Sequence, residues 1–262
     1  MHLQELLLPL AAILSTTVAR PVTTPYDPIV RLLDGPRAPG DLIDFTAEYG
    51  AQASNFLKAQ LGSPGVVDLL DAQIEAGDVF WKDVIGRSDP FNPINVYGQA
   101  AIVAPSDVLN TTVLAAWLGT CATIGYPNRL EQGNPQHYLM QRSNGTQATI
   151  EQTGAGPLSY TIAGPAERQP FMKKLAGFPF QGYASAKLRD GSLFAYAQNA
   201  FKDNEDGNGL EAELNLYLPS ATPKEILEPA REHLAIEVSN WLRFAYEDIV
   251  SRAWTYQPLP SA

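Results

Sequence analysis

The chain of 262 residues carries a formal net charge of −10, and 45% of its residues are hydrophobic against 18% charged. This composition is globular and excludes a disordered or fibrous protein. The acidic balance offers no electrostatic attraction to nucleic acid or to an anionic membrane surface, so we expect neither as a partner. Cys121 is the single cysteine, which excludes an internal disulfide and leaves the hydrophobic core to hold the fold.

Residues 1–19 have the pattern of a cleaved signal peptide. A short apolar run from Leu6 to Leu14 precedes small residues, with Thr17 and Ala19 spaced as signal peptidase requires. The run is too short for a bilayer of ~30 Å, so we expect no membrane insertion. The segment before the run lacks Lys and Arg, which leaves open an N-terminal helix that stays on the protein.

Two glycosylation sequons agree with export. They begin at Asn110 and Asn144, and each has the Asn-x-Thr pattern of an acceptor site in the secretory lumen. We therefore expect a secreted or lumenal glycoprotein that carries sugar chains at these two asparagines.

Residues 20–93 predict an N-terminal extension with a helical appendage. Five prolines between residues 20 and 40 indicate an extended lead-in. Apolar residues then recur at helical spacing from Asp41 to Leu61 and again from Val66 to Ile74, around a Ser-Pro-Gly break. Prolines and turn formers at residues 88–93 end this region.

Strands dominate the remaining chain, residues 94–262. A strand over residues 94–104 leads through Pro105 into a helix that we expect to reach Leu118. Six further strand-like runs are joined by short polar or Gly-bearing turns, which are typical of an antiparallel meander. These runs cover residues 136–142, 147–152, 157–163, 180–189, 192–202 and 210–218.

A long amphipathic helix follows the last strand. The four residues from Thr222 to Glu225 have the pattern of a capping box, and Pro229 predicts a kink or a delayed start. After Pro229, apolar residues form one stripe that we expect to cover the apolar face of the sheet. The stripe consists of Leu234, Val238, Trp241, Leu242, Ala245 and Ile249.

The order of these elements resembles a known architecture. Gly98 to Leu109 read GQAAIVAPSDVL, an apolar first strand that runs through Ala-Pro into a helix. With the meander and the final helix, over residues 94–254, this is similar to the helix-grip architecture of the START and birch-pollen-allergen superfamily, which includes polyketide cyclases and dehydratases. The resemblance implies an α+β fold with a seven-stranded curved antiparallel sheet around the long C-terminal helix, and a cavity for a small apolar molecule.

The resemblance implies functions of different classes. One is an enzyme of small-molecule biosynthesis, of the cyclase or dehydratase kind and including pericyclases, that folds a polyketide- or terpenoid-like substrate in an enclosed cavity. Such reactions need mainly shape, desolvation and one or two hydrogen-bonding groups, so a strong catalytic motif is not required. The alternative is a non-catalytic secreted carrier of a lipid or aromatic ligand. An interaction protein with a filled core comes third.

Common catalytic and metal-binding motifs are absent from the sequence. It contains no G-x-S-x-G elbow, phosphate-binding Gly-rich loop, H-E-x-x-H or paired cysteines. Only His137 and His233 follow the predicted signal peptide, which excludes a three-histidine metal site within one chain. The acidic loop of residues 203–209 lacks the ligand spacing of a calcium site. We therefore expect no cofactor and no metal.

Three side chains are the candidates for catalysis. The unperturbed pKa of His137, near ~6.5, suits proton transfer, although this side chain would face solvent if Tyr138 and Met140 face inward. Tyr160 shares a strand face with apolar residues and would point into the cavity. Arg129 could hold an enolate or carboxylate of the substrate, and a structural salt bridge is its alternative role.

Aromatic and polar residues on the expected cavity wall are the candidates for ligand binding. Phe194, Tyr196 and Gln198 share one strand face by alternation, and we place that face inside. Trp241 lies on the apolar stripe of the final helix, and Tyr246 flanks it. Each also has a simpler role, because buried Tyr and Trp are commonly core residues with a hydrogen-bonded tip.

The signal-peptide pattern predicts that export removes residues 1–19, because Ala19 ends the small-residue stretch after the apolar run. N-terminal sequencing of the secreted protein should therefore begin at Arg20. A mature chain that still begins at Met1 and is recovered from the cytosol would contradict this prediction and the expected localisation together.

Overall fold

The protein is described by a computed structural model, in which side-chain surroundings are defined from Gly50 onward. The described residues are 31–32, 40–121, 125, 127–143, 145–152, 156–164 and 166–255. The chain divides into two compact units, residues 1–49 and residues 50–262. The first contains the paired strands β1 (Arg31–Leu32) and β2 (Gly40–Asp41) and the beginning of helix α1. The predicted signal peptide and Asn144 lie outside the described residues.

Helix α1 (Leu42–Gly86) consists of two helical segments that meet at a kink, as the sequence predicts. Its backbone leaves helical geometry at Gly62, with φ 63° and ψ 172°, directly before the predicted break. Glycine adopts such a positive φ readily because it has no Cβ. Beyond this kink, Trp81 packs in the main hydrophobic core and Ile74 packs against Leu139 of the sheet.

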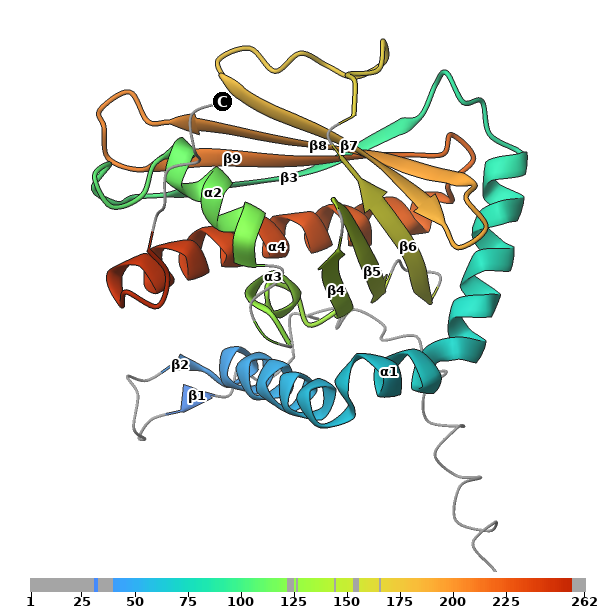
Figure 1. Cartoon of the computed structure of the whole chain (residues 1–262), viewed down its shortest axis with the longest axis horizontal. Helices are drawn as coiled ribbons and strands as arrows, with labels where there is room; N and C mark the ends of the chain where they lie inside the picture. Colours follow the sequence, from blue (N-terminus) through green and yellow to red (C-terminus); the bar gives the residue numbers. More distant parts are fainter. Residues whose placement is uncertain are drawn as a thin grey trace, which may run out of the picture. The chain divides into compact units, whose positions relative to one another are not determined.

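Seven antiparallel strands form one curled sheet in the order β3-β9-β8-β7-β6-β5-β4 (Figure 1). The strands are β3 (Ile94–Ile102), β4 (His137–Ser143), β5 (Thr146–Gln152), β6 (Pro157–Ala163), β7 (Phe180–Leu188), β8 (Leu193–Asp203) and β9 (Leu210–Leu218). The predicted first strand and the six-strand meander are therefore confirmed, with their ends displaced by two residues at most. β3, the first strand of this sheet in the sequence, pairs with β9, the last, along the whole length of β3.

Two helices connect β3 to β4. Helix α2 (Thr111–Cys121) begins later than the sequence predicts, because the residues after Pro105 form turns in which Val108 and Leu109 donate backbone hydrogen bonds to the Pro105 oxygen. Helix α3 (Arg129–Gln132) is a single turn that the sequence did not predict. The side chain of Asn128 caps it by accepting from the backbone nitrogen of Glu131 at 2.9 Å.

The C-terminal helix α4 (Lys224–Val250) lies along the inner face of the curled sheet, beside β3 and β9 (Figure 1). Its predicted apolar stripe is buried in the main core or packed against it. The predicted capping box is wrong, since the Thr222 hydroxyl donates to the Pro219 oxygen at 2.7 Å and Pro223 precedes the helix without a side-chain cap. Pro229 lies within the helix, which starts ahead of this proline rather than after it.

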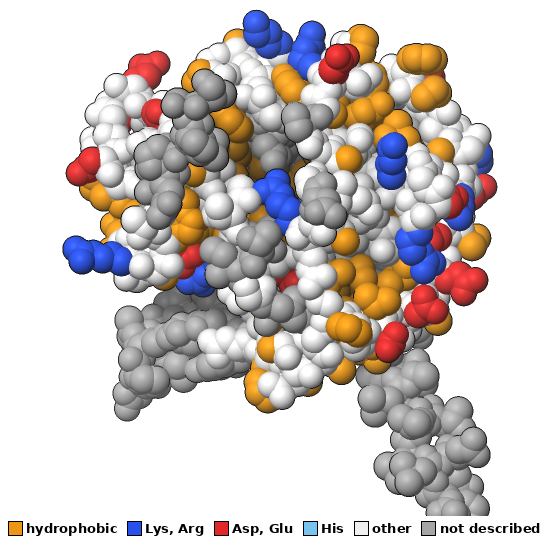
Figure 2. Space-filling view, viewed as in Figure 1, with side chains coloured by type: hydrophobic (Ala, Val, Ile, Leu, Met, Phe, Trp, Pro, Cys, Tyr) orange, Lys and Arg blue, Asp and Glu red, His pale blue; other side chains and the backbone are white. Residues whose placement is uncertain are grey.

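These elements make the predicted α+β fold, with a curled seven-stranded antiparallel sheet and a C-terminal helix. Alternate residues of β9 belong to the core shared with α4, as the sequence pattern requires. On the face of the molecule in Figure 2, basic and acidic side chains are interspersed among hydrophobic and uncharged ones. Within the described part of the chain, no helix combines the length and apolar character needed to cross a bilayer.

Gly98, in the middle of β3, lies directly against α4. A Cβ added there would overlap the backbone of Leu234 and Ala235. We therefore expect Gly98→Ala to lower the free energy of unfolding, measured by denaturant titration, by ~1–3 kcal/mol, the usual effect of overpacking. Gly182→Ala in β7 is the matched control, because its Cβ would make only an ordinary contact with Phe180 at 3.8 Å. Equal effects of the two substitutions would show that α4 is not seated on Gly98.

Candidate functional site

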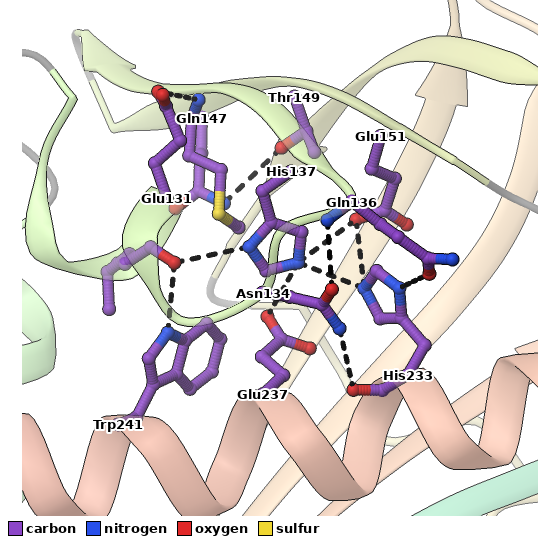
Figure 3. Close-up of polar contacts among 12 residues, drawn as sticks. Glu131, Asn134, Gln136, His137, Gln147, Thr149, Glu151, His233, Glu237 and Trp241 are labelled. Atoms are coloured by element: carbon purple, nitrogen blue, oxygen red, sulfur yellow. Dashed lines mark hydrogen bonds and ion pairs between the residues drawn. The ribbon is translucent and has the colours of Figure 1, made fainter. Parts of the chain in front are cut away.

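Three strands and helix α4 bring five polar side chains together in the interior. They are His137 on β4, Glu151 on β5, Tyr160 on β6, and His233 and Glu237 on α4. In Figure 3 the two histidine rings and the two glutamate side chains lie together between the strands and the helix. We call these five side chains the histidine–glutamate cluster.

Strand register places the three strand residues side by side. His137 pairs with Glu151 across β4 and β5. Tyr160 pairs with Thr149, two residues before Glu151, so Tyr160 and Glu151 point to the same side of the sheet. His233 and Glu237 are four residues apart on α4 and therefore share one face of that helix.

A β-bulge turns His137 inward. The register shifts after His137, which leaves Tyr138 as an extra residue in β4. His137 and Met140 are therefore both buried, although simple alternation would place them on opposite faces. The alternative in which a buried Met140 sends His137 to solvent is wrong for this reason.

Both imidazole rings are held through their Nδ1 atoms. His137 Nδ1 lies 3.2 Å from the carbonyl oxygen of Leu130, and His233 Nδ1 lies 2.9 Å from the side-chain oxygen of Gln136. A carbonyl oxygen can only accept, so each Nδ1 donates its hydrogen. The two Nε2 atoms then face each other at 2.9 Å. One proton between these nitrogens makes that contact a hydrogen bond.

Two carboxyl groups flank the pair of Nε2 atoms. Glu151 Oε2 lies 3.6 Å from the Nε2 atom of each histidine, and Glu237 Oε1 lies 3.6 Å from His137 Nε2. The Tyr160 hydroxyl lies near Glu151, whose charge acts to raise the pKa of that hydroxyl. His137 is fully buried, whereas the Glu151 side chain keeps 12% of its surface exposed. The cluster is thus enclosed on the His137 side and reaches toward solvent at Glu151.

The surroundings push the pKa values of the four titrating side chains apart. Burial, and then the neighbouring His233, lower the pKa of His137 to about 3. Burial alone would lower the pKa of His233, but Glu151 and Glu237 raise it above its ordinary value. Burial raises the pKa of Glu237 to about 8. Burial also acts to raise the pKa of Glu151, but His233 and the hydrogen bonds to this carboxylate hold it below its ordinary value.

These shifts favour different protonation states for the side chains of the cluster. The lowered pKa of His137 favours its neutral form, and the raised pKa of His233 makes this ring the one that is more readily protonated. Glu151 is ionised and Glu237 is protonated. Burial and the adjacent Glu151 charge raise the pKa of Tyr160 well above its usual value, so its hydroxyl keeps its proton. The shifts therefore favour positive charge at His233 and negative charge at Glu151.

The segment between α2 and β4 holds the histidines in place (Figure 3). The carbonyl oxygen of Leu130 accepts from His137 and also from the Trp241 indole nitrogen, at 3.1 Å. The Asn134 side chain donates to the backbone oxygen of His233 at 3.2 Å. These bonds tie β4 to α4 on either side of the paired rings.

A buried ion pair supports the bulged strand. Lys58 Nζ donates to the backbone oxygen of His137 at 2.6 Å and lies 3.4 Å from Glu131 Oε1. Glu131 Oε2 accepts from the backbone nitrogen of Met140 at 3.1 Å. Burial lowers the pKa of Lys58 and raises that of Glu131 to about 7. The pair thereby fixes the backbone on both sides of the extra residue.

The structure joins two of the three predicted catalytic residues. His137 lies 3.6 Å from Glu151, and Tyr160 lies near the same carboxylate, which acts to raise the pKa of Tyr160. Arg129 lies elsewhere, with its guanidinium 2.7 Å from Asp248 Oδ1. Arg129 therefore makes the structural salt bridge that the sequence allowed as its alternative role.

Three predicted ligand-binding residues lie in the core shared by the sheet and α4. The rings of Phe194 and Tyr160 are 5.6 Å apart between centroids, and Phe194 also packs edge-on against Trp81 at 4.8 Å. Trp241 is buried in the same core, and Tyr246 packs at its margin. These rings fill the part of the interior beside the cluster.

Tyr196 and Gln198 lie on the opposite face of the sheet. They pair with Tyr217 and Asn215 of β9, whose intervening residue Leu216 faces the core. Gln198 is fully buried there and accepts from the Tyr217 hydroxyl at 2.9 Å. The prediction that Phe194, Tyr196 and Gln198 share one inward face is therefore wrong, because the register between β7 and β8 shifts at Phe194 and places Phe194 on the other face of the sheet from Tyr196 and Gln198.

The cluster lies just beneath the surface. Gln136, which holds His233, is exposed. Among the described residues, no histidine is visible on the face in Figure 2, in keeping with the burial of both rings. A shallow, open hollow of about 280 Å³ lies outside the cluster. It is lined by Gln99, Ala100, Ala101, Phe178, Glu211 and Ala212.

The sequon at Asn110 has a structural role. Its side-chain oxygen accepts from the backbone nitrogen of Val113 at 3.0 Å, and its side-chain nitrogen donates to the Ser106 oxygen at 2.9 Å. Asn110 therefore caps helix α2 in the structure. Glycosylation at this residue stays a prediction.

Sequence reasoning missed three residues of the cluster as site residues: Glu151, His233 and Glu237. A signal for two of them existed, because Glu237 lies among the apolar residues of the final helix, next to Val238, and His233 precedes it by one turn. A charged side chain on the buried face of a helix needs a partner, and His233 lies one turn away on the same face. Glu151 carried no such signal, since its strand alternates without interruption.

Comparisons with known proteins leave the family open. No protein-family model matches the chain, and no curated protein matches it. Among solved structures, the chain is similar to an uncharacterized protein from Rhizobium leguminosarum, with 12% sequence identity and a TM-score of 0.33 over 60% of this chain and 96% of that one. A likeness at this level carries no argument about fold or function.

The two histidines predict opposite dependences of stability on pH. Because folding lowers the pKa of His137, its contribution is fully present above the unfolded value of ~6.5 and is lost as the pH falls, by about 1.4 kcal/mol per pH unit. Because folding raises the pKa of His233, its contribution is fully present below ~6.5 and is lost as the pH rises through the folded value.

Denaturant titration at a series of pH values tests both predicted pH dependences of stability. The difference in unfolding free energy between wild type and His137→Gln should shrink as the pH falls below ~6, and that for His233→Gln should shrink as the pH rises above ~7. Each variant serves as the control for the other. Differences that stay constant with pH would contradict the assigned protonation states.

Proposed function

We propose that this protein is a small-molecule enzyme of the cyclase or dehydratase kind, with the histidine–glutamate cluster as its acid–base centre. The observation that carries the proposal is the meeting of three buried side chains, His137, His233 and Glu237, with the largely buried Glu151 between the sheet and α4. Removing charges from water costs several kcal/mol per ion, and such groups gather at functional sites. A carrier needs an apolar cavity and no ionisable group, so the cluster favours the enzyme.

The two glutamates supply the base and the acid. Glu151 is ionised, partly exposed and near Tyr160, so it can accept a proton from a carbon or hydroxyl of the substrate. Glu237 keeps its proton because burial raises its pKa to about 8, and it stands beside His233, whose pKa is raised. The Glu237 carboxyl group can therefore donate its proton to a leaving oxygen of the substrate, or polarise a carbonyl group of the substrate. Neighbouring carboxyl groups with separated pKa values are typical of acid–base pairs.

Fold and surroundings agree with an apolar substrate. We infer a helix-grip fold, supported by the strand order that places the first strand beside the last and by the long helix on the inner face. Gln136, which holds His233, is exposed, so a substrate would approach the cluster at this side chain. We also propose that the chain is exported.

Turnover of small molecules tests the proposed function. Polyketide- and terpenoid-like compounds are incubated with the protein, and mass spectrometry follows isomeric products or the loss of one water. We expect conversion by wild type, and conversion slower by about 10²–10⁴-fold in Glu151→Gln, the usual contribution of a general base. Glu211→Gln is the matched control, because this partly buried strand carboxylate pairs with Lys202 outside the cluster.

Two results would count against the proposal. Binding of a compound by wild type without conversion would make the protein a carrier. Conversion that is undiminished in Glu151→Gln would remove this carboxylate as the base.

A further inference from the structure

We infer that His137, His233 and Glu237 bind one divalent transition-metal ion, with Glu151 beside it. Nitrogen and oxygen atoms from the three residues all lie within 4.8 Å of one another. This inference departs from the sequence-based expectation of no metal, which rested in part on excluding a three-histidine site, because here a carboxylate takes the place of the third histidine. This inference deepens the proposed function and rests on the same site, but a metal can bind whether or not a substrate is turned over.

The imidazole rings have the orientation that metal-binding histidines adopt. Each Nδ1 donates to a carbonyl oxygen, that of Leu130 for His137 and that of the Gln136 side chain for His233. Metal-bound histidines almost always donate their second ring N–H in this way, which fixes the tautomer and directs the other nitrogen at the ion. Both Nε2 atoms therefore face one place, and a metal ion there would replace the proton that they share.

The distances are close to those around a tetrahedral ion. With Zn–N bonds of about 2.0–2.1 Å, two nitrogen ligands of such an ion lie ~3.3 Å apart. The Nε2 atoms are 2.9 Å apart, and Glu237 Oε1 lies 3.6 Å from His137 Nε2. The rings need to part by roughly 0.4 Å to admit the ion. The His233 ring is held by the side chain of exposed Gln136, and the His137 ring by the backbone oxygen of Leu130.

Two imidazoles and a carboxylate select the class of metal. Zn²⁺, Co²⁺ and Fe²⁺ suit this mixture, whereas Mg²⁺ and Ca²⁺ prefer sites made of oxygen alone. Three protein ligands leave one position open, as in catalytic metal sites. Glu151 lies 3.6 Å from both Nε2 atoms, so it can accept a proton from a water in that position. The ion then takes over the electrophilic role, and Glu151 remains the base.

Metal titration of the untagged full-length chain tests the inference without any substrate. The protein is treated with EDTA, freed of chelator, and titrated with Zn²⁺ against a chromophoric competitor. We expect one tightly bound ion per chain, retained through gel filtration. Titration with Co²⁺ should give the intense visible absorption of a tetrahedral nitrogen and oxygen site. Mg²⁺ should not compete.

Variants locate the ion. Glu237→Gln and His233→Gln should each weaken Zn²⁺ binding by at least about tenfold, since even residues that only support a metal ligand contribute this much. Glu213→Gln is the matched control, because this buried carboxylate on β9 hydrogen-bonds Asn215 outside the cluster, and it should bind as wild type does. Circular dichroism confirms that each variant is folded. His137→Gln is left out because its ring is fully buried.

The outcomes separate this inference from the proposed function. A wild-type chain that retains no zinc, or Glu237→Gln and His233→Gln variants that both bind it as tightly as wild type, would overturn the metal site. Zinc binding that depends on both residues supports the site even if no compound is converted. Conversion by a chain that binds no metal would overturn the metal site and leave the acid–base enzyme standing.

Discussion

The seating of α4 on β3 is the contact on which the rest of the structure depends. Gly98 has no Cβ, so the backbone at Leu234 and Ala235 reaches the strand directly. His233 precedes this contact and Glu237 follows it within the same helical turn, so the contact sets how far both side chains lie from β4 and β5. A larger residue at position 98 would push the helix away and separate the cluster. One strand position thus governs a site far along the chain.

Stability alone does not explain the cluster. His233, whose pKa is raised, lies 3.6 Å from Glu151, whose pKa is lowered, and the pKa shifts of His137 and Glu237 beside them favour their neutral forms. Well-packed apolar side chains in place of a buried ion pair are often neutral or stabilising, whereas loss of one partner is strongly destabilising. A network of this kind is therefore more readily understood through its chemistry than through the folding energy it supplies.

The strands could be predicted because each buries one face, so alternation marks them, and short turns give their order. The bulge at Tyr138 could not be predicted from the sequence, because one extra residue in a strand leaves no trace in composition or periodicity. Helix α3 was missed since a single capped turn has no repeat. Tyr160 was placed by alternation, but His137 came from elimination. Its contact with His233 spans 96 residues, and only the folded register brings them together.

The carbonyl oxygen of Leu130 accepts from two rings at once, the His137 imidazole and the Trp241 indole. Hydrogen bonds that share an atom polarise one another, so a change of charge at the imidazole alters the bond to the indole. Indole emission responds to such changes in its local field. The chain has four tryptophans, and this arrangement makes one of them a built-in optical sensor for the state of the cluster.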